Sequence, residues 1–229
     1  MARLSVTEIM AQIAATVNQD AAAPTAGGSE WTLWLSFINR SVQEWAESQE
    51  WEDLRKTYYP TITGTTQASI SLPHDFKGLA GPVKLWGADG LTQGETWPVA
   101  LPEQVDMYNS EDKYIYIAGN MGDGKYISWH PGTLASGASI SVPYFSIPTS
   151  LASPAQVPLL GDSQFLVDRV IAYVFEARSD PRFQEQEQKA REKLLQMVER
   201  NNMDKYNSYG GSNYVTNATS KQGFRLGRD

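Results

Sequence analysis

The chain has 229 residues, with 19 basic and 26 acidic side chains, a net charge of −7 and no cysteine. This length allows one large domain or two small ones, burying about 70 to 75% of the surface that the unfolded chain exposes. The acidic balance argues against nonspecific nucleic-acid binding by the whole molecule, and the absence of cysteine excludes disulfides, thiolate catalysis and cysteine-ligated zinc.

Two amphipathic helices are expected at the N-terminal end. The Ser-x-x-Glu pattern at residues 5–8 is a capping box, and the apolar spacing after it predicts a helix over residues 5–18. Residues 21–28 contain Pro and Gly, which is typical of a link, and Ser29 is the expected N-cap of a second helix reaching residue 52. Its apolar stripe, which suits a domain core or a subunit contact, comprises Trp31, Trp34, Leu35, Ile38, Val42 and Trp45.

The middle of the chain has the period-two pattern of β-strands. Turn residues separate seven such segments, which predicts an antiparallel β module with one short helix at 102–108 covering an end of the sheet. The expected strands are residues 58–62, 68–72, 83–86, 96–100, 114–117, 126–129 and 140–145.

Two further helices follow a Pro-rich connector at residues 148–158. Asp162 is the expected N-cap of a strongly apolar helix, which we place at the centre of the fold. Ser179, Asp180 and Pro181 interrupt this pattern, and a last, more charged helix begins after them.

These elements predict an α+β fold. Residues 1–56 and 161–203 are expected to form a helical bundle, and residues 57–160 an inserted antiparallel β-rich module. Residues 204–229 are expected to form an extended, flexible C-terminal arm, because this segment is rich in Gly, Ser and Asn.

The C-terminal arm is the candidate binding element. From residue 201 onward the chain holds four basic and two acidic residues, the opposite of the acidic body, and its isolated aromatics have no core of their own. Docking on a partner would use these groups, whereas the alternative is a disordered end kept soluble by a few charges. The candidate partner-binding residues are Tyr206, Tyr209, Tyr214, Phe224, Arg225 and Arg228.

No motif in the sequence predicts catalysis, a metal site or a cofactor. Residues 119–125 nearly match a phosphate-binding loop, but Tyr126 replaces the Mg²⁺-binding hydroxyl and a strand pattern follows, so a hairpin turn explains the glycines better. His74 and His130 each adjoin a proline and are interpreted as turn residues. No signal peptide or transmembrane segment is predicted, so a soluble protein is expected.

Three tryptophans on predicted strands leave a second interpretation open. Trp86, Trp97 and Trp129 would stack on sugar rings if they were exposed, as in a glycan-binding module, or they would fill the core of the sheet.

Three motifs resemble the head-to-tail adaptor proteins of tailed bacteriophages, particularly those of short-tailed phages. They are the Trp-rich segment 45–51, the Tyr-Tyr-Pro at 58–60 and the Leu-Pro-His-Asp-Phe at 72–76. The resemblance implies a structural virion protein without catalysis, assembled in the host cytoplasm. It implies a homo-oligomeric ring, typically a dodecamer, in the neck between the portal protein and the tail or nozzle proteins. Packaged DNA would pass through its channel without sequence-specific binding, and no membrane would be involved.

Overall fold

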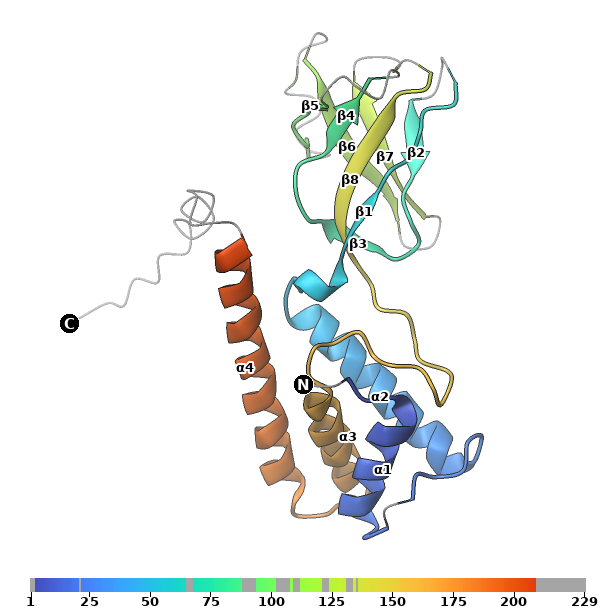
Figure 1. Cartoon of the computed structure of the whole chain (residues 1–229), viewed down its shortest axis with the longest axis vertical. Helices are drawn as coiled ribbons and strands as arrows, with labels where there is room; N and C mark the ends of the chain where they lie inside the picture. Colours follow the sequence, from blue (N-terminus) through green and yellow to red (C-terminus); the bar gives the residue numbers. More distant parts are fainter. Residues whose placement is uncertain are drawn as a thin grey trace, which may run out of the picture.

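The structure is a computed structural model with a helical body at one end and a β module at the other (Figure 1). It describes residues 3–20, 22–64, 68–87, 94–101, 108, 112–120, 124–130, 134 and 136–208, the side chains of 204–208 excepted. The described part contains helices before and after a set of antiparallel strands, which confirms the α+β class.

The helical body consists of α1 (Val6–Val17), α2 (Ser29–Ser48), α3 (Ser163–Ala177) and α4 (Phe183–Ser208). The predicted capping box of α1 is present, since the Ser5 hydroxyl accepts from the Glu8 backbone and the Glu8 carboxylate accepts from the Ser5 backbone. The Asp162 carboxylate accepts from the Gln164 amide at 3.1 Å and caps α3 as predicted.

Three helix boundaries differ from the prediction. Ser29 is the first residue of α2, and Gly28 is its N-cap, without a side-chain hydrogen bond. The helix ends at Ser48, and a short 3₁₀ turn, η1 (Glu52–Leu54), replaces its expected last turn. The last helix continues to Ser208, so residues 204–208, expected in the extended arm, are helical.

The β module contains eight short strands in the described residues. They are β1 (Arg55–Tyr58), β2 (Ser69–Ser71), β3 (Phe76–Leu79), β4 (Lys84–Trp86), β5 (Glu95–Thr96), β6 (Tyr114–Asn120), β7 (Gly124–His130) and β8 (Ser139–Ser146). One sheet has the order β1-β8-β4-β5, with β3 also paired to β8, and a second has the order β2-β7-β6. All strand pairs are antiparallel, as predicted.

The strand prediction missed β3 and shifted β1. The first strand pairs as residues 55–58 rather than 58–62, because Pro60 lacks an amide hydrogen for the ladder. The Phe-Lys-Gly-Leu sequence of β3 does not alternate clearly, and its pairing with β8 shifts register between Phe76 and Gly78. The helix predicted at 102–108 falls almost wholly outside the described residues.

The two parts have separate hydrophobic cores. The helical core collects the buried stripes of all four helices, including Trp31, Trp34, Ile38 and Trp45 from α2. Leu151 and Leu160 of the connector also belong to it, so the connector packs on the helical body and not on the β module. The β core comprises Ile62, Ile70, Leu72, Phe76, Val83, Leu85, Trp97, Ile115, Ile127, Trp129, Ala138, Ile140, Val142 and Tyr144.

Asp75, in the turn before β3, ties three strands together. Its carboxylate accepts from Lys56 Nζ of β1 at 2.7 Å and from the Tyr144 hydroxyl of β8 at 3.0 Å. Partial burial tends to raise the pKa of Asp75, but the two hydrogen bonds outweigh it, so the pKa lies below its ordinary value of 3.8. Burial, followed by the Asp75 hydrogen bond, raises the pKa of Tyr144 to about 12.

We expect Asp75→Asn to lower the free energy of unfolding near pH 7 by about 1 kcal/mol, because the pair is partly exposed. A depressed carboxylate pKa stabilises the fold above the unfolded-state value, and this contribution is lost as the pH falls below about 4. Urea unfolding from pH 7 to pH 3 should therefore show the difference from the wild type shrinking towards zero. Glu199→Gln, an exposed carboxylate on α4, is the control; a difference that grows on acidification contradicts the assignment.

Candidate functional site

The C-terminal end of α2 is the joint between the helical body and the β module. After Ser48 the chain doubles back, so the Trp51 indole nitrogen donates to the Trp45 carbonyl at 2.6 Å. The two indole rings stack with centroids 5.0 Å apart, and both residues are buried. The Trp-rich segment therefore builds a turn, and its tryptophans serve packing.

Asn201 of α4 clamps the same turn. Its side-chain amide donates to the Glu50 carbonyl at 3.1 Å, and its oxygen accepts from the Glu52 amide at 3.2 Å. Asn201 is only 9% exposed, so these backbone groups have little access to water as a substitute. A single side chain thus fixes α4 against the start of η1.

Two side chains of the β module complete the joint. Lys77 of β3 donates to the Ala46 carbonyl at 2.5 Å and lies 3.5 Å from the Gln49 carbonyl. Ser146 of β8 is fully buried and donates to the Leu54 carbonyl at 3.0 Å. The lysine places a positive charge at the negative end of the α2 dipole, whose last turn has no basic residue of its own.

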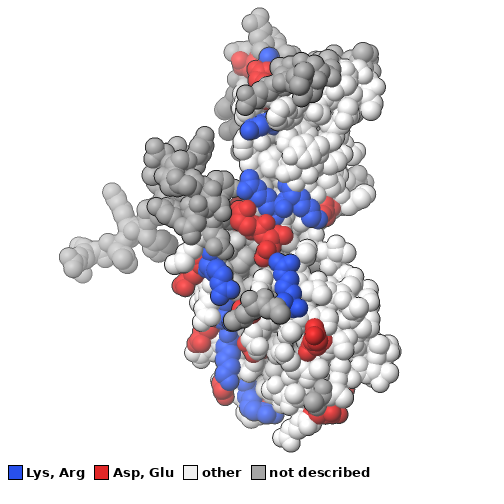
Figure 2. All heavy atoms as spheres, in the orientation of Figure 1, with Lys and Arg blue, Asp and Glu red and all other residues white. Residues whose placement is uncertain are grey.

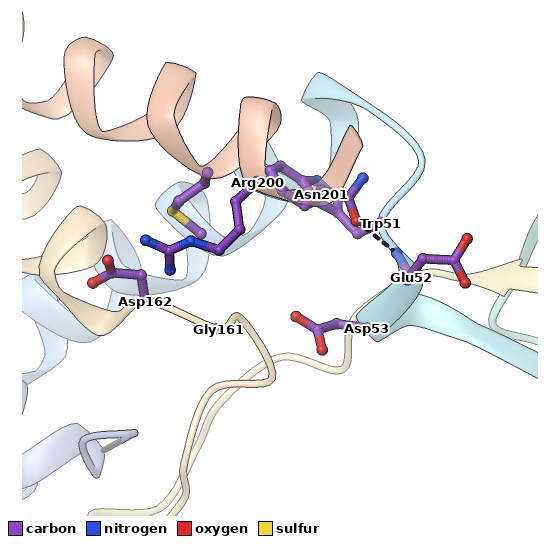
Figure 3. A pocket seen from close by; sticks show the side chains of 8 residues that line it. Trp51, Glu52, Asp53, Gly161, Asp162, Arg200 and Asn201 are labelled. Carbon is purple, nitrogen blue, oxygen red and sulfur yellow. Dashed lines mark hydrogen bonds between the residues drawn. The ribbon is translucent and has the colours of Figure 1, made fainter. Parts of the chain in front are cut away.

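A small pocket opens at this joint, between η1, the residues before α3 and the end of α4 (Figure 3). Its volume is about 100 Å³, below the range of roughly 300 to 1,000 Å³ that is typical of small-molecule sites. Arg200 points across it towards Asp162, whose carboxylate already pairs with Lys193 at 2.9 Å, and Asp53 lies on the far side. The size of the pocket suits ordered water better than a cofactor.

Two separate hollows lie along α2. The first has a volume of about 630 Å³, lies over α3, and is bounded by Arg40, Glu44 and Glu47 of α2 and by Leu194 of α4. The second, of about 370 Å³, lies between α2 and α3, and its lining includes the apolar Leu33 and Phe37 as well as Glu30 and Arg178. We call the first hollow the α2–α4 groove.

The floor of the α2–α4 groove is an ordered polar network. Glu44 accepts from Arg169 Nε at 2.8 Å and from the Tyr173 hydroxyl at 2.9 Å. Arg40 and Arg169 both lie over the Tyr173 ring, with their guanidinium carbons 4.5 and 4.6 Å from its centroid. Burial, and then the Glu44 carboxylate, raises the pKa of Tyr173 above its ordinary value. These hydrogen bonds and ring contacts connect α2 to α3 across the floor of the groove.

Charge on the visible face of the molecule gathers in two places. In Figure 2 acidic and basic side chains lie along α4 and at the level of η1 and β1, whereas the visible face of the β module above them is largely uncharged. The described pairs at these places include Arg55 with Glu52 at 3.4 Å and Lys189 with Glu185 at 2.7 Å. Because the signs are mixed, neither place is a basic surface suited to gripping DNA.

The outer face of the β2-β7-β6 sheet is rich in tyrosine, which the sequence reasoning missed. Tyr114, Tyr116, Tyr126 and His130 lie on this face, since β6 and β7 pair with Tyr114 opposite His130. Tyr114 is covered by stacking with Tyr108 and His130, while Tyr126 is 40% exposed. The sequence Tyr-Ile-Tyr-Ile at 114–117 could have predicted this face. Side chains alternate along a strand, so the two isoleucines lie on one face of the sheet and the two tyrosines on the other.

The predicted arm residues lie mostly outside the description. Tyr206 is in the last turns of α4, with its side chain undescribed. The other five candidate partner-binding residues, namely Tyr209, Tyr214, Phe224, Arg225 and Arg228, lie outside the described residues. The binding role of the arm stays a prediction.

The glycine-rich segment 119–125 connects paired strands. Gly119 pairs with Lys125 and Asn120 with Gly124, and β7 continues directly from Gly124. Gly119 has φ +92°, and a Cβ there would meet the Gly124 carbonyl oxygen. Lys125 Nζ lies 3.5 Å from the Lys77 carbonyl and over the Phe76 ring. A strand, β7, follows the segment where a phosphate-binding loop requires a helix, so the described residues on either side of the loop tip confirm the hairpin interpretation.

Two of the three strand tryptophans belong to the β core. Trp97 and Trp129 are 6% and 4% exposed, while Trp86 is partly buried. The described residues contain no group of three or more acidic or histidine side chains placed to hold a metal ion. Within the same residues, no helix is both long and apolar enough to span a bilayer.

Comparison with known proteins adds no identification. No protein-family model matches the chain, and no curated protein matches its sequence.

The Asn201 clamp gives a sharp test of the joint. We expect Asn201→Ala to lower the free energy of unfolding by about 1 to 3 kcal/mol, because it leaves the Glu50 carbonyl and the Glu52 amide without their partner. Denaturant unfolding measures the change. Asn202→Ala, at the exposed neighbouring position, is the matched control and should change stability by less than about 0.5 kcal/mol. Equal effects of the two substitutions would contradict the clamp.

Proposed function

We propose that this protein is a structural, non-catalytic adaptor of a bacteriophage neck, forming a ring between the portal protein and the tail. The supporting observation is where the sequence motifs of the resemblance meet in space. The Trp-rich segment 45–51 forms the turn at the end of α2, and the motif at 72–76 leads directly into Lys77, which binds the carbonyls of that helix. Motifs about 25 residues apart therefore build one joint.

A joint of this kind suits a non-catalytic protein that holds two binding surfaces at a fixed relative orientation. The helical body and the β module have their own cores, and side-chain contacts from three elements fix the angle between them. An adaptor needs two surfaces held in register, one for each neighbour in the assembly. The helical body offers the α2–α4 groove and the β module offers the tyrosine-rich sheet face.

The alternative function is a β-rich glycan-binding module of a tail or surface protein. Burial of Trp97 and Trp129 leaves it without the three-indole platform on which it was based. The exposed Tyr126 and the partly exposed Tyr116 are the remaining rings that a sugar could reach. We favour the adaptor because it uses the whole chain, whereas glycan binding would use only the β module.

Assembly with a portal protein tests the proposal. We expect native mass spectrometry of the protein mixed with a portal ring to show a symmetric multi-copy complex, typically with twelve copies of this chain. A glycan array in parallel should show no binding. Failure to form any symmetric complex across salt and protein concentration, together with a glycan signal that Tyr126→Ala removes, would favour the alternative.

The C-terminal arm has a separate test within the same assay. Truncation after Ser208 retains all of α4 and the Asn201 clamp, so the body should keep its cooperative unfolding. We expect at least tenfold weaker assembly onto the portal, because aromatic and arginine anchors are lost. Replacing Tyr214 and Phe224 by Ser in the full chain is the matched variant that retains length and charge. Equal assembly by the truncated and full-length chains would contradict the role of the arm.

A further inference from the structure

One edge of the β module is a strand with no neighbouring strand on its outer side among the described residues. β1 is the terminal strand of the β1-β8-β4-β5 sheet, and β2, the next strand along the chain, pairs with β7 in the other sheet. Pairing with β8 continues past β1, since the Ile140 amide donates to the Pro60 carbonyl at 3.0 Å and the Ile62 amide donates to the Ala138 carbonyl at 2.7 Å. Residues 55–62 therefore form one extended edge along β8.

The hydrogen bonds to β8 use alternate residues of this edge. In an antiparallel pair, the residues that bond to the neighbouring strand alternate with residues whose amide and carbonyl groups point to the opposite side. Pro60 and Ile62 bond to β8, so the backbone groups of Thr57, Tyr59 and Thr61 point outwards, and we call these three residues the open edge. Within the described part of the chain, their outward groups have no hydrogen-bond partner. The missing amide hydrogen of Pro60 faces β8 and leaves the outer side intact.

The side chains of the open edge suit pairing with another strand. All three are exposed, Tyr59 to 66%, and all are β-branched or aromatic. Protected edges usually carry a charged side chain, an outward proline or a bulge, and these three positions have a regular register and no charge. An edge of this kind can accept a further strand through backbone hydrogen bonds.

A second copy of this chain is complementary to the open edge. If two copies lie antiparallel about a twofold axis at Tyr59, the two Tyr59 residues are opposite each other, and Thr57 is opposite Thr61 of the second copy. Each of these pairs exchanges two hydrogen bonds, which satisfies every outward group of the open edge in both copies. Tyr with Tyr and Thr with Thr are also favourable cross-strand pairs.

Neighbouring residues favour this register. A shift towards the start of the strand would place Arg55 in the interface, but its amide already donates to the Glu52 carbonyl. A shift in the other direction would use residues beyond Ile62, where the described pairing with β8 ends. With Tyr59 at the centre, Lys56 lies opposite Ile62 of the second copy, so the backbones of the two Lys56 residues are about 20 Å apart. Like charges therefore do not oppose the contact.

We propose that two copies of this chain pair antiparallel along residues 57–61, with Tyr59 on the twofold axis, and so join their β1-β8-β4-β5 sheets into one sheet across the interface. This inference goes beyond the adaptor function and does not rest on it, because an isologous contact is complete with two copies and requires neither a ring nor a portal protein. The contact consists of a short strand pair, so we expect a weak, concentration-dependent dimer.

Disulfide trapping on the full-length chain tests the register, because the chain has no native cysteine. The Cα atoms of Tyr59 in the two copies would be about 5.5 Å apart, which permits a disulfide, whereas those of Thr57 would be about 14 Å apart. We expect Tyr59→Cys to form a linked dimer about tenfold faster than Thr57→Cys alone. A mixture of Thr57→Cys and Thr61→Cys should again link quickly, as a heterodimer. Equal rates for Tyr59→Cys and Thr57→Cys would overturn the proposal.

A charge exchange at the centre of the interface gives a second test without a covalent bond. Tyr59→Glu and Tyr59→Lys each place like charges opposite one another, so each variant alone should dimerise about tenfold more weakly than the wild type in analytical ultracentrifugation. An equimolar mixture of the two should recover the dimer as a heterodimer. Val157→Glu, at an exposed position of the connector, is the control and should leave dimerisation unchanged.

Two results of the ultracentrifugation contradict the proposal. One is a wild-type chain that stays monomeric up to about 1 mM. The other is a dimer that both Tyr59 variants retain, because that dimer uses another surface. Since no portal protein is present, either result leaves the adaptor assay unaffected.

Discussion

The end of α2 carries the constraint on which the rest of the structure depends. The last carbonyls of a helix have no partner within the helix, and burying them without one is costly. Here they are satisfied from outside, because Trp51 binds the Trp45 carbonyl and Lys77 of β3 binds that of Ala46. Asn201 of α4 then binds the Glu50 carbonyl two residues past the helical end. Each neighbouring part of the fold thus contributes one donor to the same turn.

These hydrogen bonds explain how the helical body and the β module, which have separate hydrophobic cores, keep a fixed relative orientation. Neither core extends across the joint, so apolar packing alone would leave the angle between the helical body and the β module poorly fixed. Directional hydrogen bonds to backbone groups have a defined geometry, and the buried Ser146 and Asn201 provide it here. The proposed adaptor function would require this property, because it would hold two neighbours at a fixed relative orientation.

The surfaces available for binding differ in chemistry at the two ends. The β module presents the partly exposed Tyr116 and the exposed Tyr126 on one sheet face, and tyrosine is typical of protein interfaces because it gives a large contact area with little loss of side-chain freedom. The helical body presents the α2–α4 groove, which has charged side chains on its walls and the Glu44, Arg169 and Tyr173 network at its floor. Under the proposed function, the two ends would therefore offer chemically different surfaces to the two neighbours in the assembly.

The sequence by itself determined the local elements, because their signals are local. The capping box at Ser5, the Asp162 cap and the period-two strands depend on neighbouring residues, and they identified α1, α3 and most of the β module. The same reasoning showed that the glycines at 119–125 belong to a hairpin. The apolar stripe of α2 also indicated which of its residues are buried.

Only the tertiary structure decided where α2 ends and what its end binds. The sequence after Ser48 has no glycine or proline to stop the helix, and the stop comes from Trp51, Lys77 and Asn201, which are up to 150 residues away from one another. β3 was likewise not predicted from the sequence. Its residues alternate only weakly between apolar and polar, and its pairing with β8 is seen only in the tertiary structure. The α2–α4 groove and the tyrosine face arise from helices and strands placed side by side, and spacing along a single element does not specify which other element lies next to it.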